Sequence, residues 1–153
     1  MENKNLEKHF TASAIIINKG KVLLVNHRKL GVWLYPGGHI ENNETPDQTV
    51  IREVKEETGL DVEIIGKRDK SLADYRADVF VLHIPYAILC ELIGKDHYHV
   101  DMIYSCKIAS GSDNQINYKQ DELKGIGFFG IEDLENIKLF PNFKKLLKKV
   151  LKE

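Results

Sequence analysis

Three glutamates, Glu53, Glu56 and Glu57, have a spacing that could gather their carboxylates at one place. At about 100° per residue on a helical wheel, they fall within an arc about 100° wide. Like charges about 4 Å apart repel by roughly 4 kcal/mol at an effective dielectric constant near 20, so such a cluster favours a nearby cation. Carboxylate oxygens suit Mg²⁺ or Mn²⁺, which keep other positions for water and phosphate. Taken alone, the spacing also fits a solvated acidic helix face.

The helix that would carry these carboxylates has well-marked ends. Thr45 is expected as its N-cap, Pro46 occupies the first helical position, and Gln48 completes a capping box. Gly59 stands just past the expected last residue. Because the apolar residues of this segment fall beside the acidic arc, we expect the carboxylates to lie at the margin of a core.

A longer pattern surrounds the acidic cluster. Gly38 is followed after five residues by Glu44, and after seven more by the run that begins at Arg52 and ends at Leu60, REVKEETGL. This pattern resembles the Nudix box at every defined position of that 23-residue motif. The preceding residues 33–38, WLYPGG, are also similar to the family's approach to the box, and the resemblance covers about residues 10–134.

The resemblance implies a fold and an activity. It predicts an α+β protein with the Nudix fold, an α/β/α sandwich with a central mixed β-sheet, in which residues 1–153 form a single Nudix hydrolase domain. The implied reaction is Mg²⁺- or Mn²⁺-dependent hydrolysis of a nucleoside diphosphate linked to another moiety, by attack of water on the pyrophosphate. The implied partner is therefore a small-molecule nucleoside diphosphate derivative.

Roles follow residue by residue from the same resemblance. The expected metal ligands are the carbonyl of Gly38 and the carboxylates of Glu53, Glu56 and Glu57. Arg52 is expected to orient these carboxylates, with Glu44 contributing from outside. The family draws its general base from the box or from a later loop, so Glu56, Glu57 and Glu122 are all candidates. Glu122 reads equally well as an ordinary exposed acid.

Candidates for substrate binding lie mostly outside the box. Arg28 could meet a phosphate, and Tyr35 or Phe129 could stack on a base. His39 matches a Pro-Gly-Gly-His turn in a subset of the family. Each of these residues also fits a plainer role as surface charge or core aromatic.

The run from His97 to Asp101, HYHVD, alternates in character. On a strand, His97, His99 and Asp101 would share one face. Such a set could bind a transition metal or contact a phosphate, and it could equally be a satisfied polar network.

Other elements must position these residues. A hairpin is expected over residues 10–18 and 22–25, followed by a short strand at 33–35. Further strands are expected near 61–67, at 79–83 or somewhat later, at 100–109 and at 125–129. A short helix is expected around 131–135, and an amphipathic helix over 140–151 should dock its apolar stripe on the sheet.

Composition limits the class of protein. The 153 residues are 42% apolar and 29% charged, which is typical of one globular domain. With 22 Lys and Arg against 23 Asp and Glu, the net charge of −1 offers no global basic field, so neither nucleic acid nor a membrane is an expected partner. No signal peptide or membrane span is evident, and we expect a cytoplasmic protein.

Two cysteines, Cys90 and Cys106, lack metal-ligand spacing and are expected to be buried, inert thiols. The sequence is compatible with a homodimer but does not indicate the oligomeric state.

Two rival functions stay open. An isoprenoid diphosphate isomerase shares the fold, although its catalytic cysteine has no evident counterpart here. A non-catalytic, nucleotide-binding regulatory Nudix domain usually lacks a box glutamate, and none is missing from this box.

Overall fold

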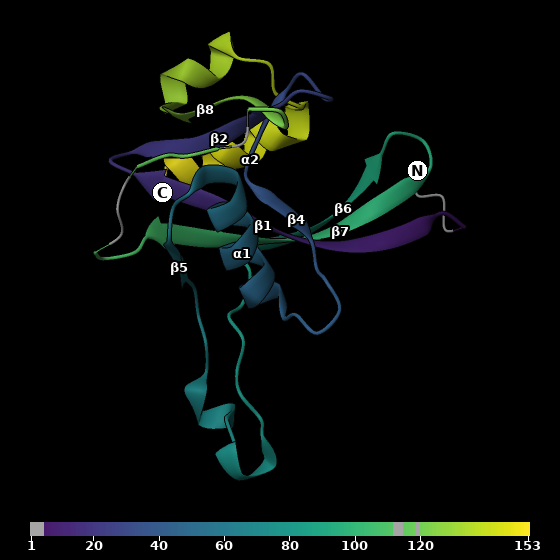
Figure 1. The fold of residues 1–153 in the computed structure, drawn as a ribbon, viewed down its shortest axis with the longest axis vertical. Coiled ribbons are helices and arrows are strands. Elements are labelled where there is room, and N and C mark those ends of the chain that lie inside the picture. Colours follow the sequence, from purple (N-terminus) through teal and green to yellow (C-terminus); the bar gives the residue numbers. More distant parts are fainter. Residues whose placement is uncertain (1–4, 112–114, 119) are drawn as a thin grey trace.

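A mixed β-sheet forms the centre of the computed structural model, which describes residues 5–111, 115–118 and 120–153 (Figure 1). Its strands are β1 (Glu7–Asn18), β2 (Lys21–His27), β3 (Trp33–Leu34), β4 (Gly37–His39), β5 (Val62–Ile65), β6 (Ala87–Ile93), β7 (His97–Ile108) and β8 (Leu123–Phe129). The main path runs β3-β2-β1-β7-β5, while β4 pairs with β1, β6 with β7, and β8 with β2. β1 and β7 are parallel, and the other pairs are antiparallel.

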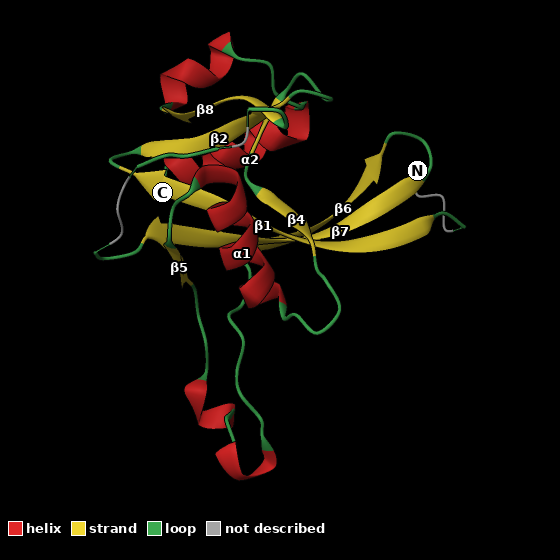
Figure 2. Ribbon diagram, in the orientation of Figure 1, coloured by secondary structure: helices red, strands yellow, loops and turns green. Residues whose placement is uncertain are grey.

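Two α-helices cover opposite faces of this sheet. Figure 2 shows α1 (Pro46–Thr58) in front and α2 (Pro141–Leu151) behind. Alternate residues of β1 face the two helices, because successive side chains of a strand point to opposite faces. Ala12, Ala14 and Ile16 join the core that contains Val50 and Val54 of α1. In contrast, Ile15 joins the core that contains Phe143, Leu147 and Val150 of α2. The expected α+β architecture with a mixed sheet between helices is confirmed.

The expected signals at the ends of α1 are all present. The Thr45 side chain accepts a hydrogen bond from the backbone N–H of Gln48 at 3.2 Å, and the Gln48 side chain accepts one from the N–H of Thr45 at 2.9 Å. Gly59 ends the helix with φ of +80°, in the left-handed region that favours glycine. The capping box thus fixes where the acidic helix starts.

The register of the sheet brings distant segments together. β1 pairs with β7 so that His9 lies opposite His99 and Thr11 opposite Asp101. On its other side β1 pairs with β4, where Thr11 lies opposite His39. The histidines and the acid of the H-x-H-x-D run therefore meet residues that stand about 90 positions earlier in the chain.

An arm formed by residues 66–86 projects away from the sheet (Figure 1). It contains two short 3₁₀-helices, Lys70–Leu72 and Tyr75–Ala77, and an isolated bridge between Asp74 and Val79. Residues 79–83 lie in this arm, and the strand expected there or later is β6, which starts at Ala87. Several apolar side chains of the arm are exposed, among them Leu72, Tyr75, Phe80 and Ile84.

Both expected C-terminal helices are present, and one expectation about the cysteines is wrong. The short helix near 131–135 is a 3₁₀-helix, Ile131–Asn136, and the C-terminal helix is α2. Both cysteines are free, and Cys106 is buried as expected, but Cys90 is exposed, so the expectation of two buried thiols is wrong for Cys90. Cys90 occupies one of the exposed positions of β6, whose side chains alternate between exposed and half-buried. Among the described residues, no helix is long and apolar enough to cross a bilayer.

Candidate active site

The three box glutamates lie at different depths beside the core. The side chain of Glu57 is 9% exposed and that of Glu53 17%, whereas Glu56 is 53% exposed. This gradient follows from the helix geometry, since Glu57 lies nearest to the apolar stripe that contains Val50 and Val54. Burial makes the charged form of the deeper acids costly unless an opposite charge is near.

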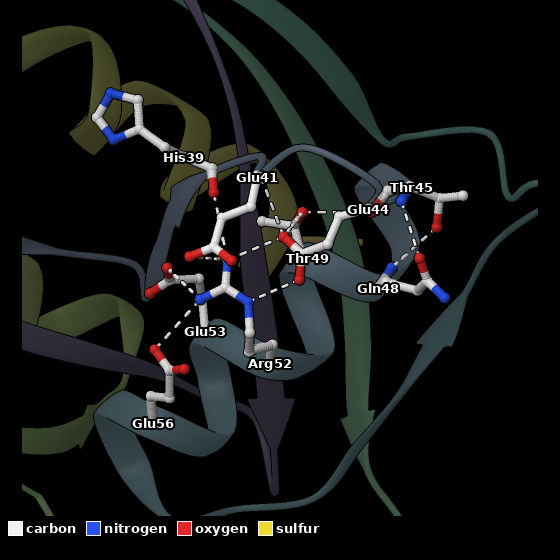
Figure 3. A network of polar contacts seen from close by, with 9 residues as sticks. All are labelled: His39, Glu41, Glu44, Thr45, Gln48, Thr49, Arg52, Glu53 and Glu56. Carbon is white, nitrogen blue, oxygen red and sulfur yellow. Dashed lines mark hydrogen bonds and ion pairs between the residues drawn. The ribbon is translucent and has the colours of Figure 1, made fainter.

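Arg52 braces the acidic cluster through its guanidinium group (Figure 3). Its Nε and Nη2 donate to the two carboxylate oxygens of Glu44 at 2.7 and 3.0 Å, a bidentate pair. Its Nη1 donates to Glu53 at 3.0 Å and to Glu56 at 3.2 Å. Hydrogen bonds from Arg52 lower the pKa of Glu44 to about 2, so Glu44 is ionised and holds the guanidinium in place. The structure thus brings together Arg52, Glu44 and the glutamates that the sequence assigned to one site.

A glycine pair in β4 lets the backbone approach these carboxylates. The N–H of Gly37 donates to Oε1 of Glu57 at 3.0 Å. A Cβ on Gly38 would lie 2.4 Å from the Glu53 carboxylate carbon, closer than any real contact. The absence of a side chain at Gly38 therefore leaves room for the Glu53 carboxylate, while the absence of one at Gly37 lets β4 lie close to Ala12 and Ser13 of β1.

The charges of the deeper carboxylates are only partly compensated, by Arg52 at Glu53 and by Gly37 and His27 at Glu57. Burial and the charge of Glu57 raise the pKa of Glu53 to about 7, even though Arg52 opposes this. Oε2 of Glu57 is buried and makes no hydrogen bond to any described residue. It lies 3.4 Å from Nε2 of His27, and Glu57 raises the pKa of this histidine against the opposing effect of burial. A buried carboxylate oxygen that faces only His27 at 3.4 Å, beside a second acid whose charged form is disfavoured by burial, fits a bound divalent cation, and oxygen donors suit Mg²⁺ or Mn²⁺.

A cavity of about 620 Å³ adjoins the glycine pair. Its polar wall includes Gly37, Gly38, His27, Glu91 and Asp101, and its apolar wall includes Leu30, Leu34, Leu92, Ile93 and Phe140. Such a volume with a few convergent polar groups suits a small-molecule ligand. Sequence reasoning missed Glu91 and Phe140, because only the pairing of β6 with β7 and the packing of the chain before α2 bring them here.

Asp101 forms a satisfied polar network in the wall of this cavity. Its Oδ1 accepts from the hydroxyls of Thr11 and Ser13, both at 2.9 Å, and its Oδ2 accepts from Tyr35 at 2.6 Å. Burial and the neighbouring acids Asp101 and Glu91 raise the pKa of Tyr35. Of the two readings of the H-x-H-x-D run, the polar network therefore holds for Asp101.

Only some of the predicted substrate-binding residues line the cavity. Tyr35 and His39 line the cavity, although the hydroxyl of Tyr35 is engaged by Asp101 and its ring packs edge-on against Phe143. Phe129 is not among the lining residues; its ring packs edge-on against Trp33 in the core on the α2 side.

Two further predicted residues lie near the end of β2. Arg28 is also absent from the cavity wall and donates from Nε to the carbonyl of Gln120 at 2.6 Å. The backbone carbonyl of Glu122 accepts from the N–H of Arg28 at 3.1 Å, and its exposed carboxylate is close enough to help raise the pKa of His27. Glu122 is therefore near His27, which in turn contacts Glu57 of the box.

Comparison with known proteins gives a consistent picture. The family model described as the NUDIX domain matches residues 7–151. The crystal structure of a NUDIX family hydrolase from Clostridium perfringens aligns with a TM-score of 0.82 and 32% identity, over 96% of this chain and 98% of that one.

Two curated relatives match over shorter lengths. A protein named probable DHNTP pyrophosphohydrolase from Lactococcus lactis is 29% identical over 84% of this chain, and an 8-oxo-dGTP diphosphatase from Proteus vulgaris is 39% identical over 40% of it. The matched regions span 66% and 57% of the length of these two relatives.

Proposed function

The chain belongs to the NUDIX family, and on this premise we propose that it is a pyrophosphohydrolase that cleaves a nucleoside diphosphate derivative with Mg²⁺ or Mn²⁺. One observation carries the proposal. Glu53 and Glu57 converge on the Gly37–Gly38 backbone, and Glu57 keeps a buried oxygen without a hydrogen bond to any described residue. Names of relatives such as pyrophosphohydrolase and diphosphatase add support for the reaction class.

In this proposal, the chain's own groups hold and orient the reacting parts. Glu53, Glu56 and Glu57 provide the oxygen ligands, with the Gly38 carbonyl as a backbone ligand. When bound there, Mg²⁺ or Mn²⁺ would neutralise the pyrophosphate oxygens and acidify the attacking water. Arg52 fixes the carboxylates, since a forked guanidinium holds two acids in defined positions. Without a Cβ, Gly38 leaves room for the Glu53 carboxylate beside the backbone.

Water is the proposed nucleophile, and the proton acceptor is one of Glu56, Glu57 and Glu122. Glu56 is the most exposed of the box glutamates, whereas Glu57 is the most buried. Glu122 approaches from the end of β2, beside His27. Removing the general base should eliminate the acidic limb of the pH–rate profile, so comparing the profiles of Glu56→Gln and Glu122→Gln distinguishes these candidates.

The cavity beside the site is the proposed seat of the group that distinguishes substrates. Its wall of Leu30, Leu34, Leu92 and Phe140 offers apolar contact, while Glu91 and His27 offer polar contact. Recognition of the pyrophosphate and recognition of the rest of the substrate are thus proposed to occur on adjacent surfaces. This division would explain why the box alone predicts the reaction and not the substrate.

The decisive experiment is an assay with Mg²⁺ or Mn²⁺ over a panel that includes ADP-ribose, dinucleoside polyphosphates, oxidised dNTPs and sugar nucleotides. Mass spectrometry of the products should show cleavage within the diphosphate link and incorporation of one water oxygen. Absence of hydrolysis across the panel, with nucleotide binding retained, would favour the regulatory domain instead. Isomerisation of an isoprenoid diphosphate without phosphate release would favour the isomerase.

A homodimer is a further part of the proposal. The exposed apolar side chains of the arm, including Leu72 and Phe80, are a surface that association would remove from water. Multi-angle light scattering of the full chain and of a variant with Leu72→Ser and Phe80→Ser tests this. A dimeric mass for the unsubstituted chain and a monomeric mass for the variant are expected.

A further inference from the structure

Four of the six histidines of the chain gather on one face of the sheet, apart from the carboxylates of α1. This histidine cluster consists of His9 from β1, His39 from β4, and His97 and His99 from β7. The strand register produces it, because His9 lies opposite His99 in the parallel pair and β4 runs along the other side of β1. The pairing of three strands thus brings four imidazoles together at one place.

The nitrogen positions of the cluster are close to those of a metal site. One ring nitrogen each from His9, His39 and His99 lies within 4.8 Å of the other two. Nε2 of His39 is 3.4 Å from Nδ1 of His9, and Nε2 of His97 is 3.2 Å from Nε2 of His99. Two nitrogens bound tetrahedrally at about 2.0–2.1 Å from one Zn²⁺ lie roughly 3.3 Å apart, so two of these separations already match.

Two of the imidazoles are oriented by carboxylates, as ligating histidines usually are. Nδ1 of His97 lies 2.8 Å from Oδ1 of Asp96, which leaves Nε2 directed at His99. Nε2 of His9 lies 3.3 Å from Oε1 of Glu7, which leaves Nδ1 directed at His39. A carboxylate on one ring nitrogen fixes the tautomer and makes the other nitrogen a better ligand.

The environment also disfavours protonation of two members of the cluster, His39 and His99. Burial and the neighbouring imidazoles of His39 and His97 lower the pKa of His99, although Asp101 opposes this. A neutral imidazole keeps the lone pair that a metal requires.

We propose that the histidine cluster is a second metal site, which binds a transition-metal cation such as Ni²⁺ or Zn²⁺ through His9, His39 and His99, with His97 beside them as a fourth donor. Imidazole ligands suit these ions, whereas the oxygen ligands of α1 suit Mg²⁺, so the two sites differ in selectivity. His39 and His99 also line the cavity, which places this cation at its rim. The His39 ring points away from Arg52, while its carbonyl accepts from Arg52 at 3.3 Å (Figure 3).

The test is isothermal titration of tag-free, metal-free protein with NiCl₂. A background of Glu53→Gln and Glu57→Gln disables the oxygen site, so that Ni²⁺ binding at α1 cannot contribute. One site is expected in this background, and adding His9→Asn with His99→Asn should weaken it at least about 100-fold. The matched control is His83→Asn, since His83 lies outside the cluster and pairs with Asp47 at 2.7 Å; its Ni²⁺ affinity should be unchanged.

Two outcomes would overturn the proposal. One is the absence of Ni²⁺ binding to the folded background variant, and the other is equal affinity in the His9/His99 variant and the His83 control. Circular dichroism of each variant checks folding. The single substitution His9→Asn, at a half-buried position, provides a second test should the double substitution unfold the protein. The absorption spectrum of bound Co²⁺ gives an independent signature, because nitrogen ligation in a tetrahedral site yields intense ligand-field bands.

Discussion

The acidic helix α1 and the histidine cluster both gather potential metal ligands, but the chain builds them in different ways. On α1, the carboxylates of Glu53, Glu56 and Glu57 are neighbours because of helical periodicity within five consecutive residues. In the histidine cluster, His9 and His99 meet only because β1 and β7 pair in one register. A shift of one residue in that register would place the two rings on opposite faces.

The two regions also differ in how their charges are held. Glu53 and Glu56 of α1 share the guanidinium of Arg52, whereas Glu57 binds the N–H of Gly37 and keeps its Oε2 without a hydrogen bond to a described residue, 3.4 Å from His27. The histidine cluster instead offers imidazole nitrogens, and burial lowers the pKa of two of its members, His39 and His99. A bound cation would therefore relieve repulsion among the acids of α1, whereas the imidazoles offer ligands without such repulsion between carboxylates.

The substitution Gly38→Ala should have a large effect on the acidic site. A Cβ there would meet the Glu53 carboxylate at 2.4 Å, so the carboxylate or β4 must move. A displacement near 1 Å at reacting groups costs about 100-fold in rate, and we expect a loss of at least that size in kcat/KM. Gly125→Ala is the matched control, because its Cβ would only reach ordinary contact with Trp33 at 3.5 Å. Equal activity of the two variants would show that the close approach at Gly38 is unimportant.

The substitution Arg52→Lys tests whether the fork, and not just its charge, positions the acids. An ammonium group cannot bind both oxygens of Glu44 while also reaching Glu53. Apparent Mg²⁺ affinity, measured by titrating activity, should fall about 10- to 100-fold. Lys55→Ala, on an exposed part of the same helix, should change this affinity less than about twofold. An unchanged Mg²⁺ affinity in Arg52→Lys would show that the forked shape of the guanidinium is not needed to position the acids.

Asp101 lies in the cavity wall, where it binds Thr11, Ser13 and Tyr35, and its removal should lower stability. Asp101→Ala would leave the buried hydroxyls of Thr11 and Ser13 without their acceptor. The free energy of unfolding, measured with urea, should fall by about 1–3 kcal/mol. The exposed acid Glu63, changed to Ala, should have an effect below about 0.5 kcal/mol. An effect of Asp101→Ala as small as that of the Glu63 control would mean that this network contributes little to the free energy of unfolding.

The pH dependence of Mg²⁺ binding should follow Glu53. Burial and Glu57 raise its pKa to about 7, so below pH 7 the carboxyl is protonated and the cation must displace that proton. Affinity should therefore fall by up to about tenfold per pH unit below 7 and level off above it. Isothermal titration at pH 6, 7 and 8 measures this. In Glu53→Gln this component should disappear, and a flat profile in the unsubstituted protein would contradict the assignment.

The sequence predicted those parts of the molecule whose causes are local. The capping box of Thr45 and Gln48 and the Gly59 terminus set the limits of α1, and helical periodicity placed the acids beside the core. The resemblance to the Nudix box assigned Arg52 and Glu44 to the same site, where they form a bidentate pair.

What the sequence could not provide depends on pairing between distant segments. The alternation of His97, His99 and Asp101 predicted a shared face, but only the β1 register shows that Asp101 binds Thr11 while the histidines meet His9. In the same way, Phe129 was a candidate for base stacking, and its packing against Trp33 depends on β2 lying between β3 and β8. Residue type alone carries no information about these neighbours.

The most direct test of the central claim is the Mg²⁺-dependent hydrolysis rate of Glu57→Gln. The amide can still accept from the N–H of Gly37, so the fold should persist, as circular dichroism would show. Loss of the carboxylate charge should reduce the rate by about 1,000-fold or more, since Glu57 is proposed to hold the cation and is one of the three candidates for the proton acceptor. A folded Glu57→Gln protein with full Mg²⁺-dependent activity would contradict the account.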